Sequence, residues 1–99
     1  MLKTSGISGV DIVNAITNSE ALKDNVGKII DIRGMAYDDN ENCAYLFGTD
    51  GKIFGSASDV VGKSVKAIIA DEQDFKFPLP ITIKTGRSKA GRDFIYLSL

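Results

Sequence analysis

The sequence predicts a small, mainly β domain of the OB-fold type, a five-stranded antiparallel β-barrel with an extra N-terminal helix. First, the 99 residues are 43% hydrophobic and 25% charged, which is ordinary for one soluble domain. Second, five segments have strand-like composition and two have helical spacing. Third, their order, α-β-β-β-α-β-β, places three strands, a helix and two strands in the succession found in such barrels. Ubiquitin-like and cystatin-like α+β folds compete with this interpretation, but they arrange their elements in a different order.

The first helix is expected to begin after Ser8, which can cap its N-terminus together with Asp11 three residues later. Apolar side chains recur on one face of this segment at Val10, Val13 and Ile16. The helix should end near Thr17–Asn18. This assigns residues 1–27 to a helical extension and residues 28–99 to the barrel, within a single domain.

Three strands are expected next, at Lys28–Tyr37, Cys43–Gly48 and Lys52–Ala57. Gly34 inside the first of them indicates a β-bulge or a close backbone approach. The dipeptide Asp50-Gly51 predicts a two-residue hairpin turn of type I′ between the second and the third.

The C-terminal part is expected to contain a helix and two strands. Ser58 can cap the helix, whose apolar stripe consists of Val61, Val65, Ile68 and Ile69. The strands are expected at Ile81–Thr85 and Arg92–Leu99, joined by a basic loop at Gly86–Gly91. Phe75 and Phe77, just before the first of these strands, are expected to pack the bottom of the barrel.

The composition argues against an enzyme. The chain has no histidine and a single cysteine, Cys43, so the usual general base and the usual nucleophile pairs are missing. No metal site or cofactor motif is apparent, and we expect neither. No apolar run approaches the ~18 residues that a membrane span needs, and no signal peptide is seen. A cytoplasmic binding module is therefore the leading expectation.

Charge is unevenly distributed along the chain. Residues 1–75 carry a balance of −5, whereas residues 76–99 carry +4. Four cations lie within nine residues that contain no acid: Lys84, Arg87, Lys89 and Arg92. Such a basic segment favours anionic partners, and these four side chains are the candidate phosphate contacts.

Aromatic residues accompany these cations. On the last strand, alternation puts Phe94 and Tyr96 on one face and apolar residues on the other, at Ile95, Leu97 and Leu99. The apolar face is the natural core side, so the two rings are expected to be exposed. Cations beside exposed rings are typical of single-stranded nucleic acid binding, because the cations neutralise phosphates and the rings stack on bases. Phe54 is a third candidate for stacking, and Tyr37 and Arg33 are weaker candidates.

Two points of this interpretation stay open. Alternation does not decide whether Tyr45 and Phe47 face the core or a ligand. The acidic loop Asp38–Asn42 opposes nucleic acid binding, since the equivalent loop of OB-folds often borders the ligand groove.

The segment Leu46–Ser58 (LFGTDGKIFGSAS), followed by a helix and by ITIKTGRSKAGRDFIYLSL, resembles the single-stranded DNA-binding proteins of small protein-primed tailed bacteriophages. The matching pieces are Asp50-Gly51, Ile53-Phe54, Ser58, Gly86, Ser88-Lys89, Gly91 and Leu97-Ser98-Leu99. The resemblance covers roughly residues 28–99 and places Phe54 at the family's aromatic position. The N-terminal helix departs from the pattern, as do Phe94 and Tyr96, where the family can carry small or polar residues.

The resemblance implies a protein that coats displaced single strands during viral DNA replication, without catalysis, in the host cytoplasm. Its expected partners are single-stranded DNA and replication proteins but no membrane, and its expected state is a monomer or a weak homo-oligomer. The alternative is a protein-interaction module of a viral replication or virion assembly, with Phe54, Phe94 and Tyr96 as a hydrophobic patch.

Overall fold

The computed structural model describes the backbone of residues 2–5, 7–70 and 78–99, and the side chains of residues 7–70 and 78–99. Phe75 and Phe77 lie outside the described residues. The elements in chain order are β1 (Leu2–Ser5), α1 (Gly9–Asn18), β2 (Glu20–Ala21), a 3₁₀ turn η1 (Leu22–Asn25), β3 (Ile29–Asp38), β4 (Cys43–Gly48), β5 (Ile53–Ser56), α2 (Asp59–Ala70), β6 (Leu79–Arg87) and β7 (Asp93–Ser98). Among the described residues, no helix is long and apolar enough to cross a membrane.

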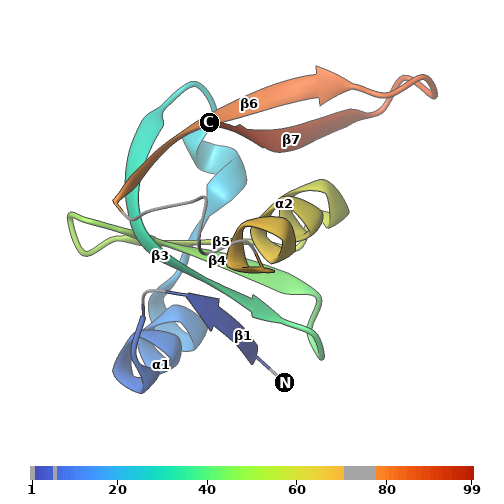
Figure 1. Cartoon of the computed structure of the whole chain (residues 1–99). Helices are drawn as coiled ribbons and strands as arrows, with labels where there is room; N and C mark the ends of the chain where they lie inside the picture. Colours follow the sequence, from blue (N-terminus) through green and yellow to red (C-terminus); the bar gives the residue numbers. More distant parts are fainter. Residues whose placement is uncertain (1, 6, 71–77) are drawn as a thin grey trace.

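All strands belong to one curled sheet with the order β2-β5-β4-β3-β6-β7, and β1 pairs with β3 outside this path. The long strand β3 organises the sheet. Its first half pairs with β6 and its second half with β1, while β4 takes the other edge. The register shifts between Ile32 and Gly34, which confirms the irregularity expected at that glycine. Because a bulge bends its strand, the sheet curls around α2 in the manner of a half-barrel (Figure 1).

The observed fold is mainly β and consistent with an OB-like barrel, but the expected five-stranded antiparallel barrel is wrong in detail. The sheet gains β1 and β2 from the segment that the sequence assigned to a helical extension. Strand β2 pairs in parallel with β5 and occupies the edge that would otherwise face β7. In the described part of the chain, no hydrogen-bonded pairing joins β5 to β7, so the barrel has an open seam there.

The concave face of the sheet packs against α2 and forms the larger core. The apolar stripe of α2 enters it through Val61, Val65 and Ile68, and the sheet contributes Leu46, Met35 and Ile83 among others. The amide of Val61 donates a hydrogen bond to Ser58 Oγ at 3.5 Å, so Ser58 caps this helix as predicted.

The convex face carries a smaller core under α1, on the side opposite α2 (Figure 1). It consists of Ala15 from α1 with Ala36, Phe47 and Ile53 from the sheet, and Ile7 and Tyr45 pack against it. The predicted capping box of α1 is present, because Ser8 and Asp11 bond each other's backbone amides. The predicted apolar stripe of this helix, however, faces solvent. Val10, Val13 and Ile16 are 71%, 60% and 62% exposed.

The turn between β4 and β5 differs from the predicted type I′ turn, which needs positive φ at both central residues. Gly51 has φ +88°, but Asp50 does not adopt a positive φ. The Gly51 amide donates to the Gly48 carbonyl, and the Gly48 amide donates to the Lys52 carbonyl. This is the pattern of a type I turn followed by a left-handed glycine.

Candidate nucleic-acid interface

Strands β6 and β7 form a hairpin whose two faces differ in chemistry. Ile83 of β6 lies opposite Leu97 of β7 and is buried. Ile95 and Leu97 pack against the larger core, so the predicted apolar side of the last strand is confirmed. Leu99, expected beside them, is 63% exposed.

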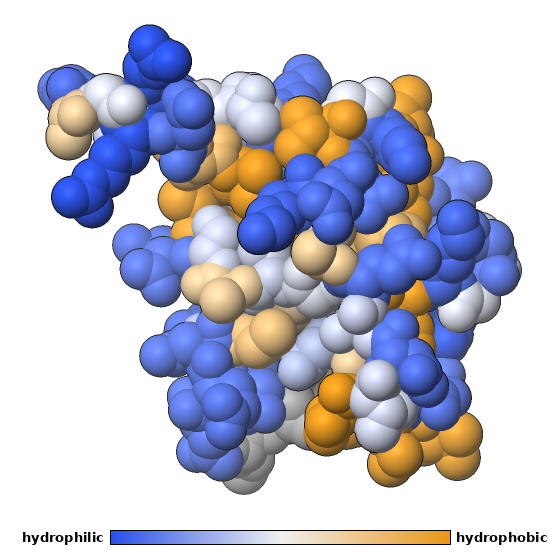
Figure 2. Space-filling view, turned by 180° about the vertical axis from the view of Figure 1, so that it is seen from behind, coloured by the Kyte–Doolittle hydropathy of each residue, from blue (hydrophilic) through white to orange (hydrophobic). Residues whose placement is uncertain are grey.

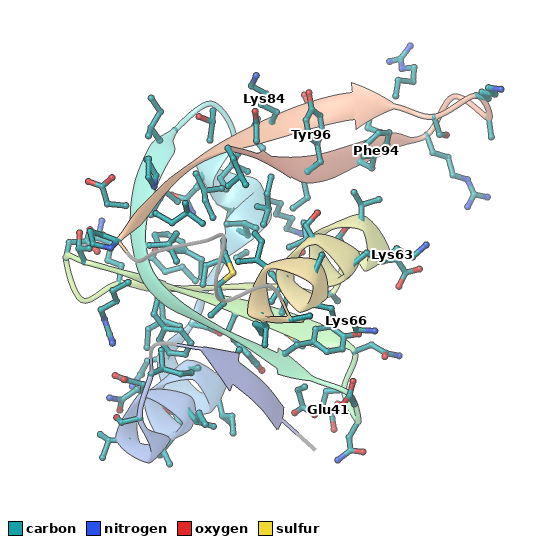
Figure 3. All side chains as sticks on the ribbon, viewed as in Figure 1. Glu41, Lys63, Lys66, Lys84, Phe94 and Tyr96 are labelled. Carbon is teal, nitrogen blue, oxygen red and sulfur yellow. The ribbon has the colours of Figure 1, made fainter. Side chains whose placement is uncertain are left out.

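The outer face of this hairpin carries the two rings of the last strand. Register pairs Lys84 with Tyr96 and Gly86 with Phe94. The Phe94 and Tyr96 ring centroids are 6.0 Å apart with an interplanar angle of 46°. Both residues are half-buried, so the expectation that their rings are exposed is met only in part. A β-carbon at Gly86 would come within 2.7 Å of Phe94 Cζ, so the Phe94 ring lies across β6 where glycine leaves room. Figure 3 shows Lys84, Tyr96 and Phe94 together on this hairpin.

The tip of the hairpin is hydrophilic and carries three of the predicted cations. In Figure 2 it projects from the body of the molecule at the upper left. Arg87, Lys89 and Arg92 are exposed. Lys84, which lies further from the tip, is exposed as well. Arg87 Nε lies 3.2 Å from Asp93 Oδ1, in a pair whose side chains are 73% and 74% exposed. Such a solvated pair is weak, so a phosphate can compete for Arg87.

The acidic loop between β3 and β4 does not border the ring pair. Figure 3 shows Glu41 at the opposite end of the molecule from Tyr96. Within the loop, Asp38 Oδ1 accepts hydrogen bonds from the amides of Asn40 and Glu41. The sequence argument against nucleic acid binding therefore does not apply to the outer face of the hairpin.

Phe54 and Tyr37 are placed in the larger core, so the expectation that their rings are exposed for stacking is wrong. Phe54 is 3% exposed and Tyr37 5%. Phe54 pairs with Leu46 across β4 and β5 and thereby falls on the concave face. The Tyr37 ring lies against Gly62 of α2, where an added β-carbon would approach it to 3.0 Å.

Arg33 forms an ion pair with Asp11 of the N-terminal helix α1. Its Nη2 and Nη1 atoms lie 2.8 Å and 3.1 Å from the two carboxylate oxygens of Asp11, a bidentate pair. The hydrogen bonds from Arg33 hold the pKa of the Asp11 carboxyl far below its ordinary value, and this pairing raises the pKa of Arg33. The guanidinium carbon also lies 5.5 Å from the centroid of the Phe47 ring.

The sequence left open whether Tyr45 and Phe47 face the core or a ligand. In the structure both belong to the smaller core. Both belong to the convex face beneath α1, with Phe47 fully buried and Tyr45 half-buried. Burial, with a smaller contribution from a hydrogen bond to Cys43, raises the pKa of Tyr45 to about 12. Neither ring is on the hairpin face.

A cleft of about 490 Å³ marks the open seam of the barrel. One wall comes from the hairpin through Thr85, Phe94 and Ile95, and the other from η1 and β5 through Lys23 and Gly55. The cleft thus adjoins one of the two rings.

The contacts of three residues were not predicted from the sequence. Gly86 was assigned to a loop but lies in β6 under Phe94. Asp93 directly follows the basic segment, and its position could have indicated a partner for Arg87. Asp11 was recognised as a capping residue only, since nothing in the sequence places it near Arg33, 22 residues away.

Comparisons with known proteins bear on the family. No curated protein and no solved structure matches the chain. The family model described as phage single-stranded DNA-binding protein, of the Phi29 type, matches residues 3–99. This match includes the hairpin and also α1, which the resemblance seen in the sequence did not cover. The chain therefore belongs to the family of Phi29-type phage single-stranded DNA-binding proteins.

Proposed function

We propose that the protein binds single-stranded DNA without sequence specificity through the outer face of the β6–β7 hairpin, and that it protects displaced strands during phage DNA replication. The observation that carries this proposal is the ring pair Phe94–Tyr96, 6.0 Å between centroids, beside Lys84 and a basic tip. Rings stack on any base because every base has a π-face. Stacking therefore supports binding without sequence preference.

The phosphates are assigned to the cations of the hairpin. Lys84 lies directly opposite Tyr96, so its ammonium group can meet the phosphate of a nucleotide stacked on that ring. The tip extends the positive surface through Lys89 and Arg92, and Arg87 joins them when a phosphate displaces Asp93. Four such contacts predict a log–log slope of affinity against salt of about −3.

The proposal is tested by fluorescence anisotropy of a labelled oligo(dT) at low and moderate salt. Binding that weakens with salt along this slope, together with similar affinities for mixed-sequence strands, is the expected result. Absence of salt-sensitive binding would overturn the proposal and favour a protein partner for the hairpin face.

Lys84→Gln is expected to weaken binding at low salt and to reduce the steepness of the salt slope by about 0.7, the contribution of one phosphate contact on a single strand. The matched control is Lys66→Gln, which removes the same charge from α2. Lys66 lies over the Tyr37 ring at 4.3 Å, away from the hairpin (Figure 3). An equal change of slope in both variants would show that net charge, not the position of Lys84, sets the salt dependence.

A further inference from the structure

The hairpin face proposed to bind DNA belongs to the convex side of the sheet, which curls from the hairpin around β3 to the part that α1 covers at the other end of the molecule (Figure 1). Thr82, on the outer face of β6, pairs with Ile29 of β3, which is 72% exposed. Further along β3, on the same convex face, come Arg33 and then Phe47 of the neighbouring strand. Beyond that point α1 covers the sheet (Figure 1).

The surface beneath the helix has the chemistry of a single-strand binding site. Phe47 and Tyr45 each supply an aromatic ring. The guanidinium carbon of Arg33 lies 5.5 Å from the centroid of the Phe47 ring. Rings combined with cations at the backbone are the elements that bind unpaired nucleotides. With α1 in place Phe47 is 0% exposed, so this chemistry is covered.

Asp11 forms the same kind of contact with Arg33 that a phosphate could form. A guanidinium takes a carboxylate and a phosphate with the same two parallel hydrogen bonds, and Asp11 makes both of them, at 2.8 Å and 3.1 Å. The pair is partly solvated, with side chains 36% and 20% exposed. A phosphodiester arriving along the sheet can therefore compete for Arg33.

The helix is attached by a small surface. Ala15 is its buried residue and Ile12 is half-buried, whereas Val10, Val13 and Ile16 are exposed. Figure 2 shows hydrophobic side chains at the lower right, over this helix. A helix of 10 residues is marginal on its own, so α1 depends on its contacts with the sheet.

From these observations we infer that the convex face of β3, β4 and β5 is a second contact surface for single-stranded DNA, which α1 masks and which DNA uncovers by displacing Asp11 from Arg33. The inference rests on the proposed function of the hairpin. From Tyr96, which is level with the start of β3, to Arg33 the DNA would run about six residues along β3, about 20 Å, and cross two strand spacings, about 10 Å. A domain of this kind covers about 4–16 nucleotides, enough to reach from one surface to the other.

Hydrogen exchange of the whole protein with and without saturating oligo(dT) tests this inference. The expected result is faster exchange of the α1 amides in the complex, together with slower exchange in β6 and β7. Slower exchange in the hairpin with unchanged α1 amides would overturn the masking and leave the proposed function standing. Failure of the oligonucleotide to bind at all would instead overturn the proposed function.

Asp11→Asn supplies the second test. It should raise the affinity for oligo(dT) about two- to fivefold, the range typical of weak ion pairs, because the DNA no longer has to displace a carboxylate. The salt slope should stay the same, because Arg33 meets a phosphate in both complexes. The control Asp39→Asn removes the same charge from the exposed loop between β3 and β4. The double variant Asp11→Asn with Arg33→Gln should lose this gain in affinity and reduce the steepness of the salt slope by about 0.7, the contribution of one phosphate contact. An Asp11→Asn protein that matches the Asp39→Asn control in affinity, or a double variant with an unchanged salt slope, would overturn the inference.

Discussion

Replacing Phe94 by alanine is expected to weaken oligo(dT) binding about 5- to 150-fold at every salt concentration, with little change in the salt slope. The physical reason is that stacking of one base on an aromatic ring contributes roughly 1–3 kcal/mol and involves no counterion release. Anisotropy titrations at several salt concentrations measure both quantities. The same ring partly covers β6, so circular dichroism must first show that the variant is folded.

Two further variants separate the ring from its surroundings. Phe94→Tyr keeps an aromatic face and should retain most of the affinity. Gly86→Ala leaves the ring in the sequence but displaces it, because the added β-carbon would lie 2.7 Å from Phe94 Cζ. It should therefore weaken binding without removing any aromatic group. If Phe94→Ala is folded and binds like the unmodified protein, the hairpin face is not the stacking surface.

Strand alternation and helix-capping residues in the sequence were sufficient to predict part of the fold. Alternation in the last strand correctly assigned Ile95 and Leu97 to the core and the two rings to the opposite face. The capping residues Ser8 and Ser58 marked the helix starts. These signals are local, because each depends on residues within one turn or one strand.

The remaining features depend on partners that are distant in the sequence. Strand β2 has two residues, too few for any periodicity, and exists because β5 offers an unpaired edge. The apolar spacing in α1 correctly grouped Val10, Val13 and Ile16, but spacing does not say whether a face is covered. The helix instead packs through the small side chain of Ala15. The pairing of Arg33 with Asp11 likewise requires the sheet to be assembled first.

Phe54 shows how an alternating pattern can be assigned to the wrong face. The sequence places Ile53 and Phe54 on opposite sides of β5, and the aromatic residue was expected to be the exposed one. In the structure both sides are covered, because α1 packs on the side of Ile53 and α2 on that of Phe54. A strand covered on both faces gives no sequence contrast between core and ligand side.

Phe54→Ala is therefore expected to destabilise the protein by about 3–5 kcal/mol, the cost of deleting a large buried ring. This is a large share of the ~5–15 kcal/mol that stabilises a typical domain, and it should lower the melting temperature by more than about 12 °C. Thermal and urea unfolding measure the loss.

Binding distinguishes this core role from a stacking role. Phe54→Leu keeps a large apolar side chain among Leu46 and its neighbours but has no π-face. If Phe54 serves only the core, the leucine variant should bind oligo(dT) with the affinity of the unmodified protein while melting at a lower temperature. A leucine variant that stays fully folded yet binds about tenfold more weakly would mean that Phe54 leaves the core to meet a base. In that case the closed arrangement of β5 against α2 would not be the state that binds DNA.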